Sequence, residues 1–147
     1  MSLIIQWLRD LQLTIQMFSQ RKMLTPTILL SIKPKYAKAI LENKKKYEFR
    51  KRRCKAEVKK IVFYATAPQS KVVGEAEIEE ILENSPTKIW EITKHAAGIT
   101  HENYCNYYQN YSKAVAYKLT NVIVYQPPKS LFECGVQHVP QSFVYLD

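Results

Sequence analysis

The stretch TILLSIKPKYAKAILENKKKYEFRKRR, residues 27–53, decides the fold because three contrasting patterns follow one another in it. The apolar run at 28–32 predicts a short strand that is covered on both faces. Pro34 suits the first turn of a helix, which we expect to end near Asn43. A basic segment follows, and we expect a second strand at 46–52.

This second strand places a carboxylate and a guanidinium on one side. Side chains alternate along a strand, so Glu48 and Arg50 point to one face, while Tyr47 and Phe49 point to the other, which we assign to the core. Lys45 comes just before them and completes a K-x-x-E-x-R pattern. We interpret Lys45, Glu48 and Arg50 as the lining of a functional cleft. The alternative is a salt bridge on a solvated face, which would contribute little stability.

The net charge of +9 is unevenly distributed. Residues 33–60 contain 13 lysines and arginines against three acidic residues, a local balance of +10, so the rest of the chain sums to about −1. Such a surface can neutralise the phosphates of RNA. The alternative is a solvated helix end and edge strand whose charge prevents aggregation. We assign nucleic-acid contacts to Lys33, Lys45, Arg50, Lys51, Arg52 and Arg53.

The cysteines and histidines predict neither a disulfide framework nor a metal site. The three cysteines, Cys54, Cys105 and Cys134, are far apart and odd in number, which is typical of a protein in the reducing cytoplasm. The three histidines lack the spacing of metal ligands. No glycine-rich phosphate loop is present either. We therefore expect no metal and no cofactor.

The first 22 residues form a pattern of their own. Apolar residues recur at spacings of 4, 3, 4 and 3, which predicts an amphipathic helix: Ile4, Leu8, Leu11, Ile15 and Phe18. The helix is too short and too polar for a transmembrane segment. It could pack on the domain, which is the commonest fate, form a homodimer with a second copy, or lie on a membrane surface. Because Met23 immediately precedes the first strand, we predict an accessory helix at 1–22 and one domain at 23–147.

The remaining sequence alternates strands with short helices. We expect strands at 58–66, 71–82, 114–125 and 142–146. The third is one long strand or two joined at Thr120-Asn121, and Pro127-Pro128 stops it. Together these elements predict one α+β domain on a small mixed sheet or barrel, which a length of 147 residues suits.

Two helix starts are marked by capping residues, at Ser85-Pro86 and at Thr100. The second helix carries four tyrosines at helical spacing, which suits core packing and, as the alternative, stacking with nucleobases. These are Tyr104, Tyr107, Tyr108 and Tyr111.

In this order the segments resemble the ASCH family of the PUA-like superfamily. The matching pieces are ILLSIKPKYAKAILENKKKYEFRKR, IVFYATAPQSKVVGEAEI, KIWEITKHAAGITHENYCNYYQNYSKAVAYKL and PQSFVYL. The resemblance covers nearly everything from Met23 onward. It implies a PUA-like small mixed β-barrel with interspersed short helices, here preceded by the N-terminal helix, with a cleft beside the first helix of the domain and the strand after it.

The resemblance implies two alternative functions. Most members resemble RNA-binding or regulatory modules, so the favoured partner is RNA or a nucleotide. A distant branch looks like amidohydrolases that remove the acetyl group from N-acetylated cytidine, a modified nucleoside, with a lysine, a threonine and a glutamate. Alignment with that branch puts the lysine on Lys45 and a companion arginine on Arg50, while Glu48 stands where the threonine belongs and Glu102 corresponds to the glutamate. The implied catalytic set is therefore Lys45, Glu48 and Glu102.

The environment of Lys45 separates the two functions chemically. An amine that is desolvated beside Arg50 loses its proton near neutral pH and can activate water. An amine that is paired closely with Glu48 stays charged and is a poor base. The sequence predicts neither environment over the other.

Overall fold

The computed structural model describes residues 2–23 and 25–146, and side chains at all of these positions except 18–23, so Phe18 of the predicted apolar stripe lies outside the described side chains. Its elements in chain order are α1 (Ser2–Met23), β1 (Thr27–Ile32), α2 (Pro34–Leu41), β2 (Tyr47–Arg50), β3 (Lys60–Ala65), β4 (Lys71–Asn84), α3 (Pro86–Thr93), η1 (Lys94–Ala96), α4 (His101–Tyr107), β5 (Ala114–Lys129), η2 (Phe132–Cys134) and β6 (Phe143–Leu146).

The six strands form one mixed sheet in the order β2-β5-β4-β3-β1-β6. The β1–β3 pair is parallel and the other pairs are antiparallel. Within the described residues β2 and β6 are the two edges, so the sheet is a curled half-barrel and does not close. The predicted α+β architecture with a mixed sheet and short helices is confirmed.

The two longest strands, β4 and β5, change register at several points, which lets them bend around the core. Gly74 lies at one of these points. The two strands approach each other closely there, since a Cβ at position 74 would lie 2.5 Å from the carbonyl oxygen of Ile123. The prediction that Pro127-Pro128 stops the strand is wrong, since β5 continues to Lys129. The register jumps from the Gly74–Val124 pair to the Val72–Lys129 pair, so both prolines lie in an irregular stretch where no ladder N–H is required.

The core is divided between the two ends of the sheet. All six residues of β1 are buried, which confirms the prediction of a strand covered on both faces. One cluster packs β1 against Ile40 of α2 inside the curl. A second cluster packs Tyr47 and Phe49 of β2 against Ile89 of α3 and Tyr104 of α4. The aromatic face of β2 therefore anchors the edge strand, and its other face is free to line a site.

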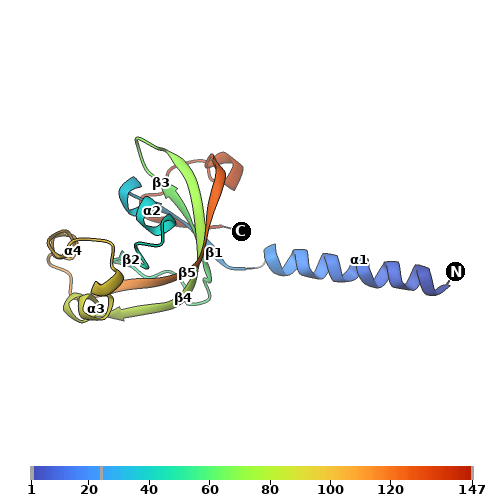
Figure 1. The fold of residues 1–147 in the computed structure, drawn as a ribbon, viewed down its shortest axis with the longest axis horizontal. Coiled ribbons are helices and arrows are strands. Elements are labelled where there is room, and N and C mark those ends of the chain that lie inside the picture. The colour runs from blue at the N-terminus through green and yellow to red at the C-terminus, as the bar shows by residue number, and fades with distance from the viewer. Residues whose placement is uncertain (1, 24, 147) are drawn as a thin grey trace.

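Helices α3 and α4 lie together at the end of the molecule opposite α1 (Figure 1). Both begin as predicted. The Ser85 hydroxyl accepts a hydrogen bond from the backbone N–H of Lys88 at 3.2 Å, and the Thr100 hydroxyl accepts one from the backbone N–H of Asn103 at 3.1 Å.

Helix α1 extends away from the sheet (Figure 1). Of the three fates considered for it, packing on the domain is not seen for the described side chains, because the large apolar ones are exposed: Leu3, Ile4, Ile5, Trp7, Leu8, Leu11, Leu13, Ile15 and Met17. An apolar stripe at helical spacing predicts a helix but does not encode which surface covers it. None of the helices in the described part of the chain is long and apolar enough to cross a membrane.

Candidate functional site

A cleft with a volume of about 640 Å³ opens beside β2. The end of β1, the first turn of α2, β2 itself and one face of α4 form its walls. The volume lies within the range typical of small-molecule sites. The lining side chains that bear on function are Lys33, Tyr36, Lys45, Glu48, Arg50, Asn103, Asn106 and Tyr107.

Three charged side chains meet at the base of this cleft. Oε2 of Glu48 lies 2.8 Å from Nη2 of Arg50, and Oε1 of Glu48 lies 3.7 Å from Nζ of Lys45. The side chains of Lys45, Glu48 and Arg50 are 1%, 7% and 14% exposed, so the trio does not lie on a solvated face. A carboxylate buried between two cations is a costly arrangement unless the ions stay paired.

The amine of Lys45 is held from several sides. Nζ donates a hydrogen bond to the carbonyl oxygen of Ala97 at 2.7 Å and lies 4.7 Å from the ring centroid of Phe49 and 5.3 Å from that of Tyr36. Burial lowers the pKa of Lys45 below the ordinary value of 10.5, and the opposing attraction of Glu48 does not reverse the shift. Both environments considered for this amine are combined here, because its side chain is 1% exposed and its Nζ also lies 3.7 Å from Oε1 of Glu48.

Gly98 allows the chain to approach Lys45 this closely. Its φ of +64 places it in the left-handed region, and a Cβ at this position would overlap the Cβ and Cγ atoms of Lys45. Any other residue at position 98 would displace Lys45 or the loop that carries the Ala97 carbonyl. Sequence reasoning missed this contact between Gly98 and Lys45, although Gly98 is one of only three glycines in the chain.

One hydrogen-bond donor of Arg50 has no acceptor among the described residues. Nη2 donates to the carbonyl oxygen of Ser31 at 2.7 Å and to Glu48, while the Tyr108 hydroxyl donates to the Arg50 carbonyl oxygen at 2.8 Å. Nε is buried and has no hydrogen-bond partner in the described part of the chain. A buried donor left unpaired costs about 1–3 kcal/mol. Arg50 also lines the cleft, so its guanidinium borders the space that a ligand would occupy.

Aromatic side chains supply the flat surfaces of the cleft. Tyr36 comes from α2 and Tyr107 from α4. Tyr107 is half-buried, and burial raises its pKa. The amine of Lys51 lies 4.6 Å from the ring centroid of Tyr107 and 4.4 Å from that of exposed Tyr111. The other two tyrosines of α4 are core residues, so the tyrosine stripe is divided between core and surface. Tyr36 is not among the site residues predicted from the sequence, and its position in the cleft was missed.

The other predicted site residues differ in whether they line the cleft that contains Lys45, Glu48 and Arg50. Lys33 lines the cleft from the N-terminal end of α2, and Arg52 and Arg53 are exposed just beyond β2. Glu102 is exposed in the first turn of α4 and is not among the lining residues. The structure therefore brings Lys45 and Glu48 together and does not bring Glu102 to them.

No group of three or more potential metal ligands occurs among residues 2–23 and 25–146. The three cysteines are free thiols: Cys54 is buried, Cys134 is half-buried and Cys105 is exposed.

A family model described as "Domain of unknown function (DUF365)" matches residues 25–139. The chain belongs to this family. The fold of this DUF365 member is similar to the crystal structure of ASCH from Zymomonas mobilis, with a TM-score of 0.74, 29% sequence identity and coverage of 82% of this chain and 87% of that one. A Tyr-to-Phe variant of the same protein gives a TM-score of 0.75, 28% identity and coverage of 82% and 90%. The predicted ASCH, PUA-like fold is confirmed.

Three curated relatives share sequence with this DUF365 member. The ASCH domain-containing ribonuclease of Zymomonas mobilis is 34% identical over 92 residues, 62% of each chain. ATP synthase subunit alpha and large ribosomal subunit protein uL22 of Ureaplasma parvum serovar 3 are each 31% identical, over 82% and 83% of this chain. The chain spans only 15% and 40% of those two proteins, so the shared region is one part of longer and differently named chains.

Proposed function

We propose that this ASCH domain binds single-stranded RNA and holds one nucleotide in the cleft beside β2. One observation carries the proposal: Arg50, whose buried Nε has no hydrogen-bond partner among the described residues, lines a cleft that also contains a carboxylate and two tyrosine rings. A nucleobase can accept from a guanidinium, donate to a carboxylate and stack on a ring. The three kinds of group in this cleft match those three properties.

Each part of the site has a separate role in this proposal. Arg50 and Glu48 read the edge of the base, and Tyr36 or Tyr107 stacks against its face. Lys33, Arg52 and Arg53 contact phosphates, because they lie in the segment 33–60 that carries the local excess of positive charge. The name of the Zymomonas relative, an ASCH domain-containing ribonuclease, supports RNA as the partner, although this chain spans 62% of that protein.

The test compares two substitutions that both keep the positive charge. We expect Arg50→Lys to weaken binding of a single-stranded RNA oligonucleotide at least about tenfold, because a lysine keeps the ion pair with Glu48 but lacks the Nε donor. Fluorescence anisotropy of a labelled oligonucleotide measures the loss. Arg53→Lys is the matched control, since exposed phosphate contacts depend on charge and we expect a change within about twofold. Equal losses for the two variants would contradict a role for Arg50 in the cleft.

A second candidate function is hydrolysis, and the lowered pKa of Lys45 is the observation that favours it. The unprotonated amine would act as a general base toward water or a ribose hydroxyl. Since only the neutral amine can accept a proton, we expect the rate to rise with pH through the lowered pKa of Lys45 and to level off below 10.5. Incubation with an RNA oligonucleotide and with N-acetylcytidine, followed by chromatography, distinguishes cleavage of the RNA backbone from removal of the acetyl group.

Two variants make this second experiment decisive. We expect Lys45→Met to abolish product formation, whereas Glu102→Gln should leave it unchanged because Glu102 is exposed and does not line the cleft. Product formation that survives in Lys45→Met would exclude Lys45 as the general base, whereas no product from wild type would exclude the hydrolase for these substrates. Product that disappears in Glu102→Gln would instead support the catalytic set implied by the family resemblance.

A further inference from the structure

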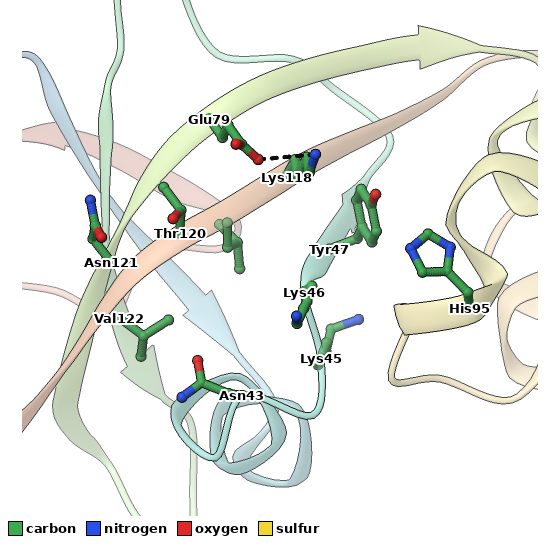
Figure 2. A pocket seen from close by; sticks show the side chains of 11 residues that line it. Asn43, Lys45, Lys46, Tyr47, Glu79, His95, Lys118, Thr120, Asn121 and Val122 are labelled. Atoms are coloured by element: carbon green, nitrogen blue, oxygen red, sulfur yellow. Dashed lines mark ion pairs between the residues drawn. The ribbon is translucent and has the colours of Figure 1, made fainter.

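A second pocket, with a volume of about 370 Å³, shares Lys45 with the cleft. It lies between β5 and the segment that joins α2 to β2, with Asn43 and Lys46 on one side and Thr120, Asn121 and Val122 on the other (Figure 2). Strand β2 borders both sites. Glu48, Phe49 and Arg50 line the cleft, whereas Tyr47 lines the pocket.

The pocket contains a cation that is available to a ligand. Lys46 is exposed and forms no ion pair with any described residue, whereas Lys118 lies 3.1 Å from Glu79. The backbone of Lys46 is fixed on both sides, because its N–H donates to the carbonyl oxygen of Ala96 and its carbonyl oxygen accepts from Leu119, each at 2.9 Å. The edge of the sheet thus holds the lysine at the pocket.

Besides the Lys118–Glu79 ion pair and the apolar Leu119 and Val122, the other lining groups are neutral polar or aromatic. The side-chain amide nitrogen of Asn121 donates to Glu77 at 2.8 Å, which leaves the amide oxygen as an acceptor, and Asn43 and Thr120 add neutral donors and acceptors. The rings of Tyr47 and His95 meet edge to face with centroids 5.9 Å apart and form one wall (Figure 2). A free cation beside amide groups and aromatic rings fits a phosphate, a base edge and a ribose better than it fits an apolar ligand.

We propose that this pocket is a second RNA subsite, which receives the nucleotide adjacent to the one in the cleft. The inference rests on the proposed function and adds to it a path for the strand across Lys45. Lys46 contacts the phosphate that links the two nucleotides, and Asn43, Thr120 and Asn121 face the second base or its ribose. Affinity then depends on the length of the RNA, and the preferred sequence includes two positions.

The test is a length series with uridine 5′-monophosphate, the dinucleotide and the tetranucleotide of uridine, measured by calorimetry or NMR titration. We expect Lys46→Gln to leave binding of the mononucleotide within about twofold of wild type and to weaken binding of the dinucleotide about tenfold, the loss of one charged hydrogen bond. The matched control is Lys44→Gln. Lys44 is exposed, lies 3.0 Å from Glu42 and does not line the pocket, so its variant should follow wild type at every length.

The outcomes separate this inference from the proposed function. If wild type binds RNA and Arg50→Lys weakens that binding, but Lys46→Gln and Lys44→Gln lose equal affinity for the dinucleotide, the second subsite is refuted and the RNA-binding cleft stands. If wild type binds no RNA of any length, both proposals fail. A loss confined to Lys46→Gln and to ligands of two or more nucleotides supports the subsite, because a change in net charge alone would affect both variants.

Discussion

Replacing Glu48 with glutamine is expected to destabilise the protein by about 3–5 kcal/mol, the typical cost of removing one partner from a buried ion pair. Glu48 is the anion between Lys45 and Arg50, and its side chain is 7% exposed. The amide would keep the shape of the carboxylate but leave two buried cations without a counter-charge. Urea unfolding at pH 7, followed by circular dichroism, measures the change in the free energy of unfolding.

The pH dependence of this loss tests its cause. Glu48 raises the pKa of Lys45 and so opposes the effect of burial, and its removal therefore lowers that pKa further. A folded state with a lowered lysine pKa binds fewer protons than the unfolded state, so stability rises with pH in that window. We expect the gap between wild type and Glu48→Gln to narrow as pH rises from the further lowered pKa of Lys45 in the variant to the pKa of Lys45 in the wild type. A gap that stays constant over this range would contradict an electrostatic origin.

An exposed carboxylate provides the control. Glu42 lies 3.0 Å from Lys44, and its side chain is 40% exposed. Exposed ion pairs of this kind contribute about 0–1 kcal/mol, so Glu42→Gln should change the free energy of unfolding by less than about 1 kcal/mol. Equal effects at positions 42 and 48 would mean that the buried trio does not stabilise the edge strand.

The local geometry of the site could be predicted from the sequence because it depends on periodicity. Alternation along a strand places Glu48 and Arg50 on one face of β2, and they share an ion pair. The environment of Lys45 could not be predicted, since the Ala97 carbonyl that accepts from it is 52 residues away and approaches only because Gly98 adopts a left-handed conformation. Such a contact depends on how two loops pack, which no periodic pattern reports.

The position of Glu102 shows a related limit. The capping residue Thr100 correctly predicts where α4 begins. It does not predict which side of that helix faces the cleft. The cleft receives Asn103, Asn106 and Tyr107, one face of the helix, whereas Glu102 is exposed on another. The start of a helix determines which of its residues share a face. Tertiary packing determines which of those faces borders the cleft.

The N-terminal helix shows the same limit for the fold. The spacing of its apolar residues predicts α1, and the structure has a helix there. Which surface covers the exposed apolar residues depends on another element or another molecule, and the spacing carries no information about either. The division into an accessory helix at 1–22 and a domain at 23–147 stays a prediction.

The basic segment after β2 gives the other large expected effect. Replacing Lys51, Arg52 and Arg53 together with glutamine should weaken binding of single-stranded RNA about a hundredfold at 0.1 M salt but only slightly at 1 M. Each phosphate contact contributes about 0.7 to the slope of log affinity against log salt concentration, so three contacts account for about 2. Arg52 and Arg53 are exposed, while Lys51 lies over the rings of Tyr107 and Tyr111 and would connect the basic segment to the cleft.

A second triple variant removes the same charge elsewhere. Lys88, Lys94 and Lys113 are exposed and lie outside residues 33–60. Their replacement with glutamine lowers the net charge equally, so it should reduce long-range attraction slightly and leave the salt slope within about 0.5 of wild type, since no phosphate contact is lost. If both triple variants flatten the slope equally, overall charge attracts the RNA and the segment after β2 has no special role. If only the first does, the phosphates of the bound strand lie along that segment, next to the cleft that holds the base.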